Sequence, residues 1–307
     1  MRSLTVIIPA TDGRRTLDRA VTAVQRAEAA PEELIVVDEP RGLGPAAARN
    51  LGSRRASGDI LVFVDADVEV HEDAFTRIRR AFDRDPGLAA VFGSYDDDPA
   101  PGGLVSDFRN LLHHHVHQQS PGMATTFWAG LGAIRRDLFL ELGGFDELRF
   151  SRPSVEDIEL GSRVHARGGP VLLDPTIQGK HLKRWTLSSM MRTDLWSRGV
   201  PWMRLVLERR ARATALNLGW RHRISTGLSV LLLVGLLRRR PRMVGTSLVA
   251  LIILDWPFYR LLFRRRGFRL AVAGVPLQLI HRLTSVVAVP VAAASHVRTS
   301  RARRSRS

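Results

Sequence analysis

Two aspartates one residue apart, Asp65 and Asp67, point most directly to chemistry in this chain. They follow Ile60–Val64, an apolar run rich in β-branched residues, which predicts a strand buried on both faces. Ligands of open α/β sheets bind just beyond the carboxyl ends of the strands. Two carboxylates in that place can hold a divalent cation, and the cation can hold a diphosphate. The residues also fit a strand that simply ends in a polar turn.

A second group of acids, Glu156, Asp157 and Glu159, opens a predicted helix. Acids in a first turn stabilise a helix by interacting with its dipole. A carboxylate at a helix start beside a pocket can also act as a general base. The sequence alone leaves both interpretations open.

The segment around residue 181 offers cations and a possible metal ligand. His181 can complete a metal site with Asp67, because neutral imidazole binds Mn²⁺ as well as zinc. A single histidine in a polar turn also fits an ordinary surface residue. Lys183 and Arg184 carry charges that can neutralise phosphates, the arginine through two parallel hydrogen bonds. The four histidines within residues 113–117 are interpreted as the polar part of a helix over 104–118, not as a metal cluster.

Strand-like and helix-like segments alternate through the first 200 residues, which predicts βαβ units and a mostly parallel α/β sheet. We expect strands over 4–8, 34–37, 60–64, 89–92 and 125–134, a short strand over 171–174 that ends at Pro175, and helices over 14–29, 46–56, 74–82 and 136–142.

Charge is distributed unevenly along the chain. Residues 201–307 contain 21 arginines and only two acids, Glu208 and Asp255, while the whole chain carries a net charge of +16. The first 200 residues are therefore close to neutral. There is no cysteine, which excludes a disulfide framework and thiolate metal sites.

The basic last third is also apolar. Its hydrophobic stretches cover 224–237, 243–263 and 267–297, and arginine clusters at 238–242 and 264–266 separate them. Arginines beside apolar helices suit anionic lipid headgroups, so we expect a membrane partner. Residues 185–207, in which tryptophans alternate with arginines, have the composition of an interfacial helix. A nucleic-acid-binding tail and a buried helical domain with a solvated arginine face are the alternatives, and the number of membrane spans is open.

In their order along the chain, these segments resemble the family 2 glycosyltransferases, which have the GT-A fold, over roughly residues 3–200. The resemblance rests on 6–10 (VIIPA), 34–38 (LIVVD), 44–52 (GPAAARNLG), 65–67 (DAD), 133–136 (AIRR), 143–147 (GGFDE) and 156–157 (ED).

The resemblance implies roles for individual residues. It implies donor binding by Pro9, Asp12, Asp38, Arg49, Asn50 and Asp65, metal binding by Asp67 with Asp65 and His181, acceptor or phosphate binding by Trp128, Gly130, Arg184 and Trp185, and catalysis by Asp157 with Glu156. The implied cofactor is Mg²⁺ or Mn²⁺.

Three positions depart from the family pattern. After the second strand the family usually has Asp-Asp-Gly-Ser, whereas this chain has residues 38–41 (DEPR). After the first proline the family commonly has Tyr-Asn, whereas this chain has Thr11-Asp12. Both segments contact the nucleotide, so the base is left open. His181 stands where processive members have glutamine in Gln-x-x-Arg-Trp, so we expect addition of one sugar and no polymerisation.

We therefore expect a GT-A catalytic domain over 1–200 and a membrane-associated helical region with an arginine-rich tail over 201–307. The expected reaction is inverting, metal-assisted hexosyl transfer from a nucleotide-sugar donor to a lipid-linked acceptor at the cytoplasmic face of the cell membrane, within cell-envelope synthesis and without a nucleic-acid partner. The alternatives are a nucleotidyltransferase on a similar sheet and a non-enzymatic binder that uses the arginine-rich end.

Overall fold

The computed structural model describes residues 2–13, 15–100, 102–209 and 220–304 and divides into two compact units. Unit 1 comprises residues 1–100 and 116–183, and unit 2 comprises residues 101–115 and 184–307. Residues 184–200, which the sequence analysis assigned to the catalytic domain, thus belong to unit 2.

Unit 1 is built on one mixed sheet. Its strands are β1 (Leu4–Pro9), β2 (Glu33–Val37), β3 (Ile60–Val64), β4 (Val68–Val70), β5 (Ala90–Tyr95), β6 (Gly122–Ala124), β7 (Leu131–Arg135) and β8 (Val171–His181). They follow the order β2-β1-β3-β7-β5-β8-β4, and β6 pairs with β8. The pairs β1–β2, β1–β3 and β5–β8 are parallel and the others are antiparallel. The α/β class is confirmed, with more antiparallel pairing than the mostly parallel sheet we expected.

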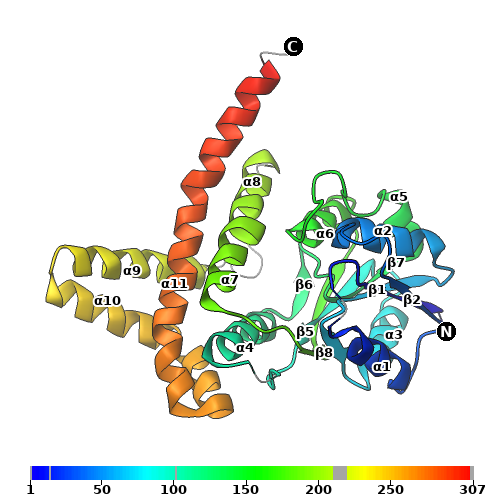
Figure 1. The fold of residues 1–307 in the computed structure, drawn as a ribbon, viewed down its shortest axis with the longest axis horizontal. Coiled ribbons are helices and arrows are strands. Elements are labelled where there is room, and N and C mark those ends of the chain that lie inside the picture. Colours follow the sequence, from blue (N-terminus) through cyan, green and yellow to red (C-terminus); the bar gives the residue numbers. More distant parts are fainter. Residues whose placement is uncertain (1, 14, 101, 210–219, 305–307) are drawn as a thin grey trace. The chain divides into compact units, whose positions relative to one another are not determined.

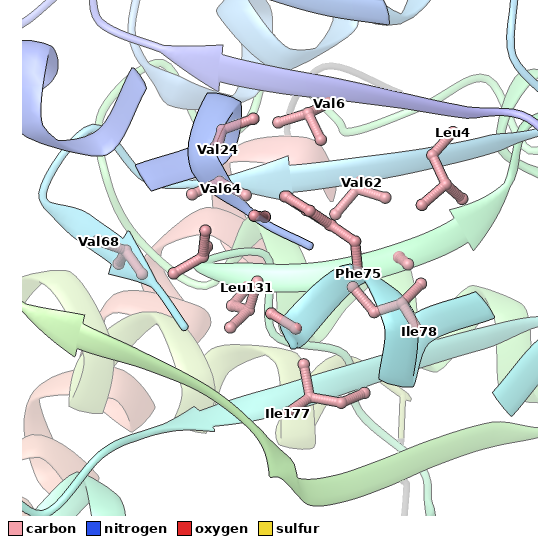
Figure 2. Close-up of a cluster of buried hydrophobic side chains, with 14 of the residues drawn as sticks. Leu4, Val6, Val24, Val62, Val64, Val68, Phe75, Ile78, Leu131 and Ile177 are labelled. Carbon is pink, nitrogen blue, oxygen red and sulfur yellow. The ribbon is translucent and has the colours of Figure 1, made fainter. Parts of the chain in front are cut away.

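Helices cover both faces of this sheet (Figure 1). Helices α1 (Leu17–Arg26) and α3 (Ala74–Arg84) pack on the face to which Leu4, Val6 and Ile8 point. Figure 2 shows part of this core, where Val24 of α1 and Phe75 of α3 meet the valines of β3. Because side chains alternate between the two faces of a strand, every second residue of β1 belongs to this core.

The opposite face of the sheet carries α2 (Pro45–Arg55) and α5 (Arg136–Glu141). Fully buried Phe63 of β3 packs against Phe139 and Phe145, with ring centroids 5.4 and 5.2 Å away. Helix α2 lies so close to β1 that a Cβ atom on Gly52 would be 2.5 Å from a methyl carbon of Ile7. Helix α6 (Glu156–Ala166) completes the helices of unit 1.

Three predicted strands were wrong in extent, and one of them, expected over 89–92, runs over Ala90–Tyr95 as β5. The turn expected at Pro175 is absent, and β8 continues to His181. The register of β8 against β5 shifts between Leu173 and Gln178, so Pro175 lies in an irregularity where its missing N–H removes no ladder hydrogen bond. The strand expected over 125–134 is confined to β7, and residues 125–130 form a loop.

Unit 2 is helical. It contains most of α4 (Leu104–Gln118), then α7 (Leu187–Arg192), the π-helix η1 (Thr193–Gly199), α8 (Val200–Arg209), α9 (Trp220–Leu237), α10 (Pro241–Leu254) and α11 (Trp256–Arg304). Helices α9 and α10 pack as a hairpin, and α11 bends at Gly267, whose φ is 76°. The helix expected over 104–118 is confirmed. The arginine-rich tail, 298–306, lies partly outside the described residues.

One helix of the described residues, Trp256–Ser295, is long and apolar enough to cross a membrane, and α10 is a shorter apolar helix. Polar residues near the middle of the long helix Trp256–Ser295 are paired inside unit 2. His281 Nδ1 lies 2.7 Å from Asp194 Oδ2, and Arg282 lies 2.6 Å from Asp255. Buried charges need such partners, so these residues do not interrupt the helix.

Replacing Phe63 with alanine tests the core that supports β3. The substitution removes the ring that packs against both Phe139 and Phe145, and we expect the free energy of unfolding to fall by about 3–5 kcal/mol. Chemical denaturation followed by circular dichroism measures the change. As a control, Leu148→Ala alters a side chain that is 95% exposed and should change the free energy by less than about 0.5 kcal/mol. Equal effects of both would contradict the assigned core.

Candidate active site

The Asp65-Ala66-Asp67 segment forms the turn between β3 and β4, and its backbone is held from two sides. The Asp65 N–H donates to the carbonyl of Gly130 at 3.0 Å, and the Leu182 N–H donates to the carbonyl of Asp67 at 2.8 Å. The two carboxylates therefore start from a fixed backbone at the carboxyl end of β3, as the sequence predicted.

The structure brings His181 to Asp67 from the end of β8. His181 Nε2 lies 3.5 Å from Asp67 Oδ2, and His181 is only 4% exposed. The alternative of a surface histidine in a polar turn is therefore wrong. Burial raises the pKa of Asp67, but the hydrogen bond and charge of His181 and the charge of Lys183 outweigh burial, so this pKa lies below its ordinary value. Asp67 is thus ionised at neutral pH.

One carboxylate and one imidazole suit a divalent metal that also binds phosphates. Mg²⁺ and Mn²⁺ accept such ligands, and nucleotide sites commonly use one or two carboxylates together with substrate phosphates and water. Within the part of the chain that the structure describes, no three His, Cys, Asp or Glu side chains form a metal-binding group. A divalent cation held by Asp67 and His181 would take its further ligands from substrate or water. The histidines within 113–117 form no such group either.

Asp65 has a different partner from Asp67. Its Oδ1 accepts a hydrogen bond from Arg49 Nη2 at 2.6 Å, and Arg49 Nη1 donates to Glu156 Oε1 at 3.0 Å. Arg49 is 4% exposed, and its guanidinium lies 5.5 Å from the centroid of the Phe145 ring. A single buried arginine thus joins the end of β3 to the start of α6.

Asp157 lies next to this pair on α6. Its Oδ2 accepts a hydrogen bond from the Ala129 N–H at 3.2 Å, and its Oδ1 accepts one from the Ile158 N–H at 2.8 Å. Burial raises the pKa of Asp157, the negative charge of Glu156 raises it further, and Arg49 only partly opposes them, which leaves this pKa at about 7. The carboxyl group can therefore exchange a proton near neutral pH, which general bases require.

Glu156, the other acid predicted to be catalytic, is engaged by protein on both oxygens. One accepts from Arg49, and the other accepts from the Ser154 N–H at 2.9 Å. Glu156 is also buried. Its contacts are those of a residue that anchors Arg49, so Asp157 is the better placed of the two acids.

Asn50, predicted to bind the donor, also uses its amide within the protein. Its Nδ2 donates to the Phe145 carbonyl at 2.8 Å and to Glu147 at 2.7 Å, while its Oδ1 accepts from the Phe145 N–H at 2.9 Å. These bonds tie α2 to the loop after α5. The two sequence segments that include Asn50 and Phe145 are therefore the two sides of one structural contact.

The other predicted donor residues lie where the strands end. Pro9 closes β1, its register partner Val37 closes β2, and Asp38 follows directly. Because β1, β2 and β3 are parallel, Pro9 and Asp38 lie at the same edge of the sheet as Asp65. Asp12 is exposed in the turn after β1.

The predicted acceptor residues divide between the units. Trp128 and Gly130 belong to the loop before β7, and the indole packs so closely that a Cβ atom on Gly130 would lie 2.4 Å from it. Arg184 and Trp185 belong to unit 2, where the Trp185 ring lies 5.6 Å from the guanidinium of Arg109. The acceptor and phosphate roles of these residues stay predictions.

Sequence reasoning missed two residues that contact the site. Ala129 acts through its backbone N–H on Asp157, for which side-chain type gives no signal. The ring of Tyr95 stacks on His181. Its position as the last residue of β5, at the edge that carries the acids, is a signal that could have identified it.

Comparison with known proteins identifies the first unit. Residues 7–143 match the family model described as Glycosyl transferase family 2. The chain is similar to N-acetylgalactosaminyltransferase 4 of Drosophila melanogaster, with 25% identity over 171 residues that make up 50% of this chain and 26% of that protein. It is 28% identical to N-acetylgalactosaminyltransferase 6 of the same organism over 169 residues, 48% of this chain and 25% of that protein. The chain thus spans about a quarter of the length of these curated relatives.

The fold is similar to that of the mannosyltransferase PcManGT from Pyrobaculum calidifontis, solved in complex with GDP-Man and Mn²⁺. The TM-score is 0.52 at 15% identity, and the match covers 96% of this chain and 87% of that chain. These matches decide against the nucleotidyltransferase and the non-enzymatic binder. Residues 7–143 therefore belong to a glycosyltransferase domain that matches family 2, and the fold of the chain is similar to that of GT-A glycosyltransferases.

Proposed function

We propose that this glycosyltransferase moves one sugar from a nucleotide-diphosphate sugar to a membrane-embedded acceptor, a lipid or polyprenyl phosphate, with inversion at the anomeric carbon. The observation that carries the proposal is the meeting of Asp67 and His181, 3.5 Å apart, at an edge that Arg49 links to the helix of Asp157. The similar fold of PcManGT, solved with GDP-Man and Mn²⁺, supports a sugar nucleotide and a divalent metal here.

Asp67 and His181 would hold the Mg²⁺ or Mn²⁺ ion. When bound, the ion stabilises the negative charge that develops on the diphosphate leaving group. Asp65 is held by Arg49 at the same turn, which suits a role toward the sugar or nucleotide of the donor. The partly exposed Asp67 side chain leaves room for the diphosphate.

Asp157 would act as the base. It removes the proton from an acceptor hydroxyl, whose oxygen attacks the anomeric carbon while the bond to the diphosphate breaks. One displacement with one base inverts the configuration at that carbon. An acceptor phosphate is already ionised at neutral pH and needs no base, so the contribution of Asp157 distinguishes the two acceptor types.

The proposed acceptor follows from unit 2. Large apolar side chains on its helices are exposed, among them Trp220, Leu237, Ile253 and Phe268. Arginines 238–240 and 242 lie at the turn between α9 and α10. Exposed apolar surface beside arginines suits a bilayer interface with anionic lipids, and the positive-inside rule favours the cytoplasmic face. Such a surface would recruit an acceptor that resides in the membrane.

A thermal-shift panel of nucleoside diphosphates tests the donor site. We expect one of them to raise the melting temperature of the full chain only when Mn²⁺ is present, because the diphosphate supplies the missing metal ligands. Asp67→Asn should abolish this metal-dependent shift, whereas Asp73→Asn, a change at the start of α3, should keep it. Stabilisation that is independent of Mn²⁺ would contradict the metal assignment.

Asp157→Asn tests the base. With a hydroxyl acceptor, we expect the variant to lose about 10²–10⁴-fold in kcat, since general-base catalysis contributes that much. In the unsubstituted chain kcat/KM should rise with pH up to about 7 and then level off, because the raised pKa of Asp157 leaves its carboxyl protonated below that value. Asp18→Asn, on the exposed side of α1, is the control. Full activity of Asp157→Asn with a hydroxyl acceptor would remove Asp157 from the mechanism.

Vesicle flotation tests the membrane surface. We expect the full chain to float with vesicles that contain phosphatidylglycerol, and binding should weaken as salt rises, because each arginine near the surface contributes about 1 kcal/mol of screened attraction. Changing Arg238, Arg239 and Arg240 together to glutamate should reduce this binding, while the same change at Arg54 and Arg55 of α2 should not. Equal binding by both variants would mean that Arg238, Arg239 and Arg240 do not cause the attraction to the vesicles.

A further inference from the structure

The aromatic ring of Tyr95 lies flat against the imidazole of His181. The two ring centroids are 4.1 Å apart and the planes differ by 8°. Both residues are buried, Tyr95 at 7% exposure and His181 at 4%. Tyr95 therefore covers one face of the imidazole whose Nε2 lies 3.5 Å from Asp67.

Strand register explains why these two rings meet. In the parallel pair β5–β8, Tyr95 is the register partner of Gly179, and His181 follows two residues later on the same face. Diagonal neighbours of this kind lie within reach of an aromatic side chain. Gly179 has no side chain in the way, and a Cβ atom there would lie 2.7 Å from a methyl group of Val68.

Tyr95 is itself fixed by a second ring. The Trp128 indole packs edge-on against it, with centroids 4.9 Å apart and planes at 90°. Trp128 also packs edge-on against His117, whose Nδ1 lies 2.9 Å from the Gly93 carbonyl oxygen. The tyrosine thus lies between two neighbours and cannot easily turn away from His181.

The loop that carries Trp128 contacts the rest of the site as well. The next residue, Ala129, donates its N–H to Asp157, and Gly130 accepts from the N–H of Asp65. Three consecutive residues therefore contact the site: Trp128 packs on Tyr95, Ala129 bonds Asp157, and Gly130 bonds Asp65. Trp128, the ring that packs against Tyr95, is therefore held by the same loop that contacts the acids.

Stacking matters because the last torsion of a histidine side chain is broad and does not by itself direct a ring nitrogen. Ligands whose orientation is fixed by surrounding groups bind a metal without an ordering cost at the moment of binding. His181 receives its backbone position from the ladder with β4, where it pairs with Val68. The stacked ring of Tyr95 limits rotation of the imidazole about its last torsion.

We propose that Tyr95 is a positioning residue that holds the His181 imidazole with its Nε2 toward Asp67, so that both donors are arranged before a divalent cation arrives. The inference rests on the proposed metal-assisted function. It assigns Tyr95 no contact with donor or acceptor, and Trp128 supports it through Tyr95.

The test measures the affinity of the full chain for Mn²⁺ alone, by electron paramagnetic resonance of the free ion. We expect Tyr95→Leu to weaken Mn²⁺ binding about 10–100-fold, the usual cost of losing a group that orients a ligand. Tyr95→Phe keeps the stacked ring and should bind as the unsubstituted chain does. Phe82→Leu, at a buried aromatic of α3 outside the site, is the matched control for general loss of packing and should also bind normally.

Each other outcome has a defined meaning. Tyr95→Leu with unchanged affinity, or Tyr95→Phe with the same loss as Tyr95→Leu, overturns the positioning role. If Tyr95→Leu does not fold, Trp128→Leu, which leaves Tyr95 without its edge-on neighbour, decides: weakened Mn²⁺ binding supports the role, and unchanged binding overturns it. If the unsubstituted chain does not bind Mn²⁺ alone, the same variants are compared with the nucleoside diphosphate of the thermal-shift panel present. Failure to bind Mn²⁺ there as well overturns the proposed metal use, and the role of Tyr95 with it.

Discussion

The buried guanidinium of Arg49 is the interaction on which the rest of the site depends. It bonds Asp65 at the end of β3 and Glu156 at the start of α6, and these segments are far apart in sequence. Glu156 is buried, and a buried carboxylate that loses its partner costs several kcal/mol, so the start of α6 depends on this arginine. The position of Asp157, next to Glu156, follows from the same contact. The guanidinium therefore links the end of the sheet where we propose that the metal binds to the residue that we propose as the base.

The environments of Asp67 and Asp157 also give these two acids different pKa values. Asp67 has His181 and Lys183 near it, and its pKa is lowered. Asp157 is buried beside Glu156 and shares the charge of Arg49 with two other acids, so its pKa rises to about 7. Carboxylates with such different environments take different chemical roles. Asp67, the proposed cation ligand, is ionised at neutral pH, while Asp157, the proposed base, has a pKa at which it can accept a proton.

The local sequence pattern was enough to predict β3 and the two aspartates that follow it. An apolar run indicates a buried strand, and the acids directly after it mark the carboxyl end of that strand. The pattern was not enough to divide the motif residues into those that face a ligand and those that pack. Asn50 bonds Phe145, and Arg49 bonds Glu156, across separations that only the folded chain closes. The length of β8 was missed for a related reason, since Pro175 is tolerated only because β5 shifts register beside it.

The same limit applies to the apolar end of the chain, where the sequence shows His281 and Arg282 as interruptions of a hydrophobic stretch. Inside unit 2 His281 meets Asp194, which also bonds Arg109 at 2.7 Å, and Arg282 meets Asp255. Arg109, Asp194 and Asp255 come from α4, η1 and the junction before α11, so hydropathy along one segment cannot reveal the pairing. Because His281 and Arg282 turn inward to these partners, the surface of α11 around them can be apolar. A membrane-facing helix is thus compatible with polar residues at its middle, provided that their partners lie on its own unit.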